Sequence, residues 1–199
     1  MKIAVLCSGS GTNLQAIIDS VKSDYIPADI AIVVSDKKDA YALVRAKEAG
    51  IDTLVLDIKD FGSREDFDKE MIRHLKKNKV ELVVLAGYMR LLNPCFIREY
   101  RDRIINVHPA LLPSFKGTHA IKDALKYGVK VTGATVHFVD EDLDNGPIIL
   151  QNAVGIKEGD TEETLLERVH KEEHKIYPEA IRLFAEGRLT IEGRSVRIR

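Results

Sequence analysis

Residues 1–18, MKIAVLCSGSGTNLQAII, place a short apolar strand directly before a glycine-rich loop and an amphipathic helix. The apolar run is too short for a signal peptide, and it ends at once in the loop Ser8–Asn13. Apolar residues then follow at the spacing of one helix face: Leu14, Ile17, Ile18 and Val21. A strand that turns through glycines into a helix is the opening unit of an α/β fold.

The same alternation of strand-like and helix-like segments continues along the chain. Apolar runs predict strands at residues 28–35, 53–56, 82–85, 104–107, 130–139 and 147–154. Helical patterns include residues 39–49, which Gly50 closes, a helix that starts at Ser63, and a last helix from about residue 160 toward 184 that bends before Pro178. We therefore predict a Rossmann-like α/β fold: a mostly parallel, twisted sheet of about seven strands with helices on both faces, mixed at the C-terminal strands.

Length and composition favour one globular domain. The 199 residues can bury a substantial core, and 45% are hydrophobic and 31% charged. A formal charge of -1 argues against nucleic acid or an anionic membrane as the main partner. No segment approaches the roughly 20 apolar residues of a membrane span. With only Cys7 and Cys95, neither of them in the surroundings of a nucleophile, we expect no disulfide framework and a cytoplasmic location.

Residues 104–113, IINVHPALLP, end an apolar strand with an amide and an imidazole two positions apart. Side chains at this spacing on a strand point to the same side, so Asn106 and His108 can face one point in space. The prolines that follow restrict the backbone at the strand's exit. A hydrogen-bond donor beside a group that titrates near neutral pH suits acyl-type chemistry, and an enzyme is the leading interpretation.

The loop Ser8–Asn13 is a candidate phosphate site. Its glycines permit close approach of a ligand, and the free amides at the start of the following helix favour an anion. Leu14 occupies the third glycine position of the dinucleotide fingerprint, and no Lys-Ser or Lys-Thr pair follows, so the loop is neither that motif nor a P-loop. A phosphate monoester is the better interpretation, and a plain glycine turn is the alternative.

Two further loops follow predicted strands. Residues 87–94 mix apolar side chains with Arg90, which suits the wall of a flat heteroaromatic site or, equally, a loop packed on the core. Residues 139–147 are rich in carboxylates but lack the EF-hand pattern, and most acids there are expected to be solvated. Asp144 would favour the protonated form of His108 if the two meet. Because ligands of open α/β sheets bind beyond the carboxyl ends of the strands, we expect three loops to meet at one site: Ser8–Asn13, Gly87–Leu92 and Asn106–Gly117.

The last helix carries a carboxylate within an apolar stripe. Glu173 lies in line with apolar residues at steps of four, namely Leu165, Val169, Tyr177 and Ile181. A buried, unpaired carboxylate is costly, so Glu173 meets either a cation of the protein or a polar ligand. Other histidines are weaker candidates: His137 sits inside a strand, and His170 and His174 have a metal-compatible spacing without further ligands.

Several segments together resemble the glycinamide ribonucleotide formyltransferase family, a folate-dependent family of purine synthesis. They are CSGSGTNLQAII, LAGYMRLLNP, INVHPALLPSFKG, GATVHFVDEDLDNGPIILQ and ERVHKEEHKIYP, and the likeness extends from Ile3 to about Arg188. The middle three segments belong to a wider formyltransferase group. The phosphate loop and the terminal helix point to the glycinamide ribonucleotide branch.

The resemblance implies an activity and a set of site residues. The expected reaction moves the formyl group of 10-formyltetrahydrofolate, a co-substrate, to the amine of phosphoribosylglycinamide without a metal. The catalytic positions would be Asn106, His108 and Asp144. The substrate contacts would be Gly11, Thr12, Asn13, His170 and Glu173. The folate contacts would be Arg64, Met89, Arg90, Leu91, Leu92, Asn106, Asp140, Glu141, Leu143 and Asp144.

The resemblance also implies an organisation and its alternatives. Residues 1–199 would form a single formyltransferase domain, with a phosphate-binding half at about 1–100 and a catalytic, folate-binding half at about 101–188, as a monomer or homodimer. Methionyl-tRNA formyltransferase would need an added basic domain, and formyltetrahydrofolate deformylase an added N-terminal domain, so we expect neither. A non-catalytic binding module is the alternative from another class. The complete set of Asn106, His108 and Asp144 favours the enzyme.

Overall fold

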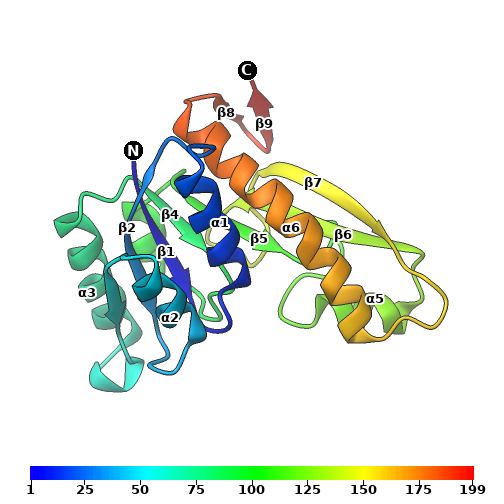
Figure 1. The fold of residues 1–199 in the computed structure, drawn as a ribbon, viewed down its shortest axis with the longest axis horizontal. Helices are drawn as coiled ribbons and strands as arrows, with labels where there is room; N and C mark the ends of the chain where they lie inside the picture. The colour runs from blue at the N-terminus through cyan, green and yellow to red at the C-terminus, as the bar shows by residue number, and fades with distance from the viewer. The chain divides into compact units, whose positions relative to one another are not determined.

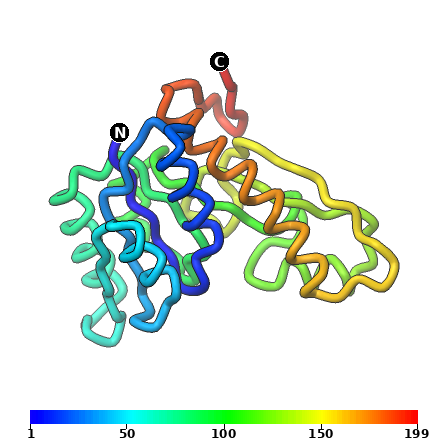
Figure 2. The backbone as a smooth tube through the Cα atoms, viewed as in Figure 1, coloured from blue at the N-terminus to red at the C-terminus, as the bar shows by residue number.

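The computed structural model describes residues 1–199, which form two compact units, Met1–Ile105 and Asn106–Arg199. Figures 1 and 2 trace the chain from its N-terminus in blue to its C-terminus in red. Strand β5 (Ile104–His108) carries the chain from the first unit into the second. None of the helices has the length and apolar character that a membrane span requires.

The first unit alternates parallel strands with helices. Its strands lie in the order β3-β2-β1-β4, and every neighbouring pair is parallel: β1 (Lys2–Cys7), β2 (Asp29–Ser35), β3 (Thr53–Val55) and β4 (Leu82–Leu85). Its helices are α1 (Thr12–Lys22), α2 (Tyr41–Glu48), the 3-10 turn η1 (Ile58–Asp60), α3 (Arg64–Lys77) and α4 (Pro94–Glu99). Because the strand order reverses at β1, right-handed crossovers put α1 and α2 on one face and α3 on the other (Figure 1).

Local sequence signals account for these elements. The central strands β1 and β4 are buried along nearly their whole length, as continuous apolar runs of a parallel sheet should be. Ser63 caps α3 by accepting a hydrogen bond from the Asp66 amide, and the apolar face of that helix buries Phe67 and Met71. Gly50, with φ of 72°, ends α2 in the left-handed conformation that glycine favours.

The second unit is built on a long antiparallel pair. Strand β6 (Val131–Phe138) pairs with β7 (Ile148–Gly155), and helix α6 (Glu162–Ala185) packs along both of them (Figure 1). Strand β9 (Ser195–Ile198) is parallel to β7 and antiparallel to β8 (Leu189–Glu192). Helix α5 (Ala120–Tyr127) packs on α6.

The predicted α/β fold with helices on both faces, mixed at the C-terminal strands, is confirmed. The chain has nine strands rather than about seven, because the tail forms the hairpin β8–β9, which turns at Gly193. Helix α5 was not predicted from the sequence. The bend predicted before Pro178 does not interrupt α6, which continues to Ala185 while Tyr177 and Ile181 remain fully buried.

A substitution at Gly133 in β6 tests how closely β6 and β7 must approach each other. A Cβ at this position would lie 2.1 Å from the carbonyl oxygen of Asn152, too close for any side chain. We expect Gly133→Ala to lower the free energy of unfolding by roughly 1–3 kcal/mol, because β6 and β7 must separate to admit the methyl group.

Gly155→Ala is the matched control, because Gly155 lies in β7 with open space at its Cβ position. Its free energy of unfolding should stay within about 0.5 kcal/mol of the wild type. Urea titrations measure both variants. Equal stability of the two would contradict the close approach at Gly133.

Candidate active site

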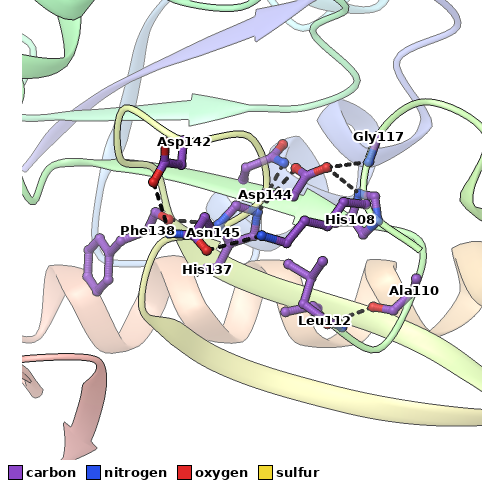
Figure 3. A network of polar contacts seen from close by, with 12 residues as sticks. His108, Ala110, Leu112, Gly117, His137, Phe138, Asp142, Asp144 and Asn145 are labelled. Atoms are coloured by element: carbon purple, nitrogen blue, oxygen red, sulfur yellow. Dashed lines mark hydrogen bonds and ion pairs between the residues drawn. The ribbon is translucent and has the colours of Figure 1, made fainter. Parts of the chain in front are cut away.

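The structure brings His108 together with Asp144, a contact that the sequence pattern left open. His108 ends β5 and is only 4% exposed, and the Asp144 side chain is 9% exposed. The Nδ1 atom of His108 lies 3.4 Å from Oδ2 of Asp144, and dashed lines in Figure 3 join the carboxylate to the imidazole and to the Gly117 backbone. An acid and an imidazole therefore share one buried cluster in the second unit.

Both ring nitrogens of His108 face oxygen atoms. Nε2 lies 2.8 Å from the carbonyl oxygen of Phe115, and Nδ1 faces the Asp144 carboxylate. A carbonyl and a carboxylate oxygen can only accept hydrogen bonds, so a ring that carries a proton on each nitrogen satisfies both. Each ring nitrogen of His108 therefore lies within reach of an oxygen acceptor.

Asp144 is fixed by backbone as well as by side-chain contacts. Its φ of 46° is left-handed, a conformation that aspartate tolerates better than most residues do. Its Oδ2 accepts a hydrogen bond of 2.7 Å from the Gly117 amide. Gly146, two residues later, packs against the Phe138 carbonyl oxygen, which a Cβ would approach to 1.9 Å. The loop can close only because residue 146 is glycine.

His137 is a member of this cluster that the sequence reasoning missed. It is 2% exposed in β6, and its Nε2 lies 3.3 Å from Nδ2 of Asn106. Burial lowers its pKa, which outweighs the opposite effects of the Phe138 carbonyl and Asp144. We assign the neutral ring, with Nδ1–H donating to the Phe138 carbonyl oxygen at 2.7 Å and Nε2 accepting from Asn106. His137 therefore orients the carboxamide of Asn106.

A second polar residue of β6 holds the segment that follows His108. The Thr135 hydroxyl donates to the Ala110 carbonyl oxygen at 2.6 Å and accepts from the Leu112 amide at 3.1 Å. The Leu112–Pro113 peptide bond, whose isomer the sequence leaves open, is cis. Figure 3 shows Ala110 and Leu112 on this segment. Thr135 and His137 alternate in an otherwise apolar strand, and this period of two was the available signal.

The predicted phosphate loop lies in the first unit. Gly11 is the N-cap of α1 with φ of 71°, and a Cβ there would lie 2.7 Å from the Ala42 side chain. No acidic residue occupies the first turn of α1, which begins at Thr12 and Asn13. The positive end of the helix dipole is thus unopposed by a local carboxylate, which suits an anion.

The predicted folate contacts of the first unit lie next to one another. Arg64 donates from Nη2 to the Leu91 carbonyl oxygen at 2.6 Å. Met89 and Leu91 are large apolar side chains, 65% and 58% exposed. Asp68 accepts from the Asn93 amide at 2.6 Å, and burial raises its pKa. The segment therefore presents apolar side chains while its backbone is tied down from α3.

The remaining predicted contacts lie in the second unit. Asp140 is half-buried and accepts from the Asp142 amide at 3.1 Å, whereas Glu141 and Leu143 are exposed. Glu173 is buried as its apolar stripe predicted, with the Nε2 atom of His170 at 3.9 Å from its carboxylate. No group of three or more His, Cys, Asp or Glu side chains is arranged to hold a metal ion.

The cysteines do not supply a nucleophile. Burial, followed by the nearby charge of Asp36, raises the pKa of the Cys7 thiol to about 12. Burial also raises the pKa of Cys95. Both thiols are therefore protonated near neutral pH, and the reactive thiolate form is suppressed.

Comparison with known proteins fits this geometry. The profile of the formyl transferase family matches residues 1–181. The chain belongs to the formyl transferase family. It is 47% identical to phosphoribosylglycinamide formyltransferase of Escherichia coli over 95% of this chain and 89% of that protein. The crystal structure of glycinamide ribonucleotide transformylase 1 from Symbiobacterium toebii covers the whole chain and 93% of its own length, with a TM-score of 0.98 and 55% identity.

Larger proteins also contain a segment similar to this formyl transferase chain. The present chain is 50% identical to the trifunctional purine biosynthetic protein adenosine-3 of Gallus gallus over 96% of its own length. The chain spans only 19% of that protein's length. The family profile matches residues 1–181, and the sequence resemblance extends from Ile3 to about Arg188, so the two cover nearly the same part of the chain.

Replacing His137 tests its assigned role. Asparagine can still reach the Phe138 carbonyl but not Asn106, whereas the longer glutamine can place an acceptor where Nε2 stood. Since one hydrogen bond contributes about 0.5–1.5 kcal/mol, we expect His137→Asn to lower kcat by about 3–10-fold. His137→Gln should stay within about twofold of the wild type, because Asn106 keeps its partner.

His119→Asn serves as a control in a formyl-transfer assay with melting curves. This histidine is exposed and contacts the neighbouring Thr118 hydroxyl at 3.1 Å. An equal loss of kcat in His137→Asn and His137→Gln, at unchanged melting temperature, would speak against orientation through Nε2.

Proposed function

We propose that this chain transfers the formyl group of 10-formyltetrahydrofolate to the amine of phosphoribosylglycinamide, giving phosphoribosyl-N-formylglycinamide and tetrahydrofolate. The observation that carries this proposal is the buried pair of His108 and Asp144, at 3.4 Å, next to the carboxamide of Asn106 on the same strand. Membership in the formyl transferase family and the similarity to phosphoribosylglycinamide formyltransferase support it.

The cluster suits direct formyl transfer. The substrate amine attacks the formyl carbon, and the carbonyl oxygen becomes an oxyanion. Asn106 supplies an N–H and His108 a cationic N–H to that oxygen, while Asp144 stabilises the charged ring. The tetrahedral adduct then collapses: the bond from carbon to the folate nitrogen breaks, and the proton lost by the amine passes to that nitrogen, through ordered water. The formyl group is already activated, so these donors suffice.

His108 needs a small rearrangement before it can act. Its ring is 4% exposed, and its Nε2–H is directed at the Phe115 carbonyl oxygen. We expect the formyl oxygen to replace this carbonyl as the acceptor of the Nε2 proton. Phe115 has a left-handed φ of 52°, which is strained for an aromatic residue. A shift of its backbone away from His108 would therefore relieve strain.

The other predicted residues receive binding roles in this proposal. Gly11, Thr12 and Asn13 at the start of α1 would bind the substrate phosphate, with His170 and Glu173 contacting the ribonucleotide. The folate would meet the side chain of Arg64, the segment Met89–Leu92 and the acidic loop of Asp140, Glu141, Leu143 and Asp144. We further expect a cytoplasmic protein, monomeric or homodimeric, with small molecules rather than nucleic acid as partners.

Removing the oxyanion donors tests the proposal. We expect Asn106→Ala and His108→Ala each to lower kcat by about 100–1,000-fold, because each removes one donor to the developing oxyanion. Absorbance reports release of tetrahydrofolate when phosphoribosylglycinamide is added to enzyme and 10-formyltetrahydrofolate. Asn106→Ala should keep the wild-type melting temperature within a few degrees. His108→Ala should melt lower, because it removes a partner of the buried Asp144 carboxylate.

Asp142→Ala is a control from the same acidic loop, since Asp142 is exposed and lies outside the catalytic cluster. It should turn over within about threefold of the wild type. Near-normal transfer by a folded His108→Ala protein would refute the assignment. Release of tetrahydrofolate without the amine would indicate hydrolysis of the formyl donor, and binding without release would indicate a non-catalytic module.

A further inference from the structure

Asp36 is a buried carboxylate of the first unit that has no role in the site described so far. It follows directly after β2 and is 7% exposed. A carboxylate in such surroundings requires partners, because burial of an unpaired charge is costly. Its two oxygen atoms make two different contacts, and both lead to the segment between residues 87 and 92.

The first contact runs through Ser8. The Ser8 hydroxyl donates to Oδ1 of Asp36 at 2.6 Å and accepts from the Met89 amide at 3.0 Å. A hydroxyl carries a single proton, so a donor bond to Asp36 turns its lone pairs toward Met89. The Ser8 amide also donates to the Gly87 carbonyl oxygen at 3.1 Å. Asp36 thereby fixes the rotamer of the side chain that binds the Met89 backbone.

The second contact is with Arg90. Its Nη1 atom lies 3.9 Å from Oδ2 of Asp36, and its guanidinium lies 5.5 Å from the centre of the Phe67 ring. The side chain is 26% exposed. Arg90 is thus held between a carboxylate and an aromatic face, and it is neither fully solvated nor free to sample many rotamers.

We propose that Asp36 is a positioning residue for the formyl donor: through Ser8 and Arg90 it sets the conformation of residues 87–92. This inference rests on the proposed function, in which residues 89–92 contact the folate. Asp36 itself does not touch the substrate. Its removal would leave the Met89 amide with a misoriented hydroxyl and release the Arg90 side chain, so the folate would bind to a less ordered surface.

The phosphate loop has anchors that do not involve Asp36. The Ala42 amide donates to the Gly9 carbonyl oxygen at 3.1 Å, and Nε of Arg45 donates to the Ser10 carbonyl oxygen at 2.9 Å. Gly11 packs directly on Ala42. Because α2 holds residues 9–11 independently, loss of Asp36 should affect the formyl donor more than the phosphorylated acceptor.

Steady-state kinetics with each substrate varied in turn tests this inference. We expect Asp36→Ala to raise KM for 10-formyltetrahydrofolate by about tenfold or more, as loss of a charge-assisted hydrogen bond and an ion pair should. KM for phosphoribosylglycinamide should change by less than about twofold, and the pH profile of kcat should not move. Calorimetric binding of 10-formyltetrahydrofolate alone should weaken by the same factor as its KM.

Conservative and coupled variants separate positioning from folding. Asp36→Asn keeps an acceptor for Ser8 but loses the charge that faces Arg90, so its donor KM should lie between the wild type and Asp36→Ala. Ser8→Ala should raise KM for 10-formyltetrahydrofolate. Asp36→Ala should raise that KM by a smaller factor in the Ser8→Ala variant than in the wild type, because part of its effect runs through Ser8. Asp57→Asn is the control: Asp57 follows β3 and only accepts from the nearby Lys59 amide, at 3.0 Å.

The outcomes distinguish this inference from the proposed function. If the wild type shows no amine-dependent release of tetrahydrofolate, the proposed function fails, whatever Asp36 does. If the wild type is active but Asp36→Ala retains its donor KM, or both KM values rise together with a lower melting temperature, the positioning role is overturned. If Asp36→Ala fails to fold, Asp36→Asn and Ser8→Ala decide the question. Each should raise KM for 10-formyltetrahydrofolate more than KM for phosphoribosylglycinamide.

Discussion

The polar cluster of the second unit depends on the carboxylate of Asp144. It accepts from the Gly117 amide at 2.7 Å and faces the Nδ1 atom of His108 at 3.4 Å. A charge that is 9% exposed must be matched by donors, and here they are His108 at the end of β5 and the Gly117 amide beyond it. The same carboxylate therefore links the path of the loop to the position of the imidazole.

One acid beside two imidazoles gives the rings different tasks. His108 has an oxygen acceptor at each nitrogen. His137 has a carbonyl acceptor at Nδ1 and the Asn106 amide at Nε2, and burial lowers its pKa, which favours the neutral ring. Groups of one kind whose surroundings favour opposite states can divide the work of a reaction. In the proposed mechanism the cationic ring meets the oxyanion and the neutral ring orients its neighbour.

Periodicity in the sequence predicted the elements but not the contacts between loops. The steps of four that bury Phe67 and Met71, and the runs that became β6 and β7, depend on local geometry alone. The family resemblance then supplied Asn106, His108 and Asp144 as a set. His137 was not predicted as a site residue, because a histidine inside a strand is equally consistent with core packing. Its partners depend on the irregular register between Val136 and His137, which no local pattern encodes.

Buried carboxylates that hold a loop in place recur in the first unit, and the sequence does not reveal them. Asp36 follows β2 and accepts from a hydroxyl, and Asp68 accepts from a loop amide although it lies within α3. Burial raises the pKa of Asp68, and the Asn93 amide with the charges of Arg64 and Arg90 offsets part of that rise. Each acid is tolerable only while the loop keeps its donors in place, so these charges select one loop conformation rather than add stability. Asp144 extends the same principle from a backbone amide to an imidazole, and in the proposed mechanism a contact that orders a loop also serves catalysis.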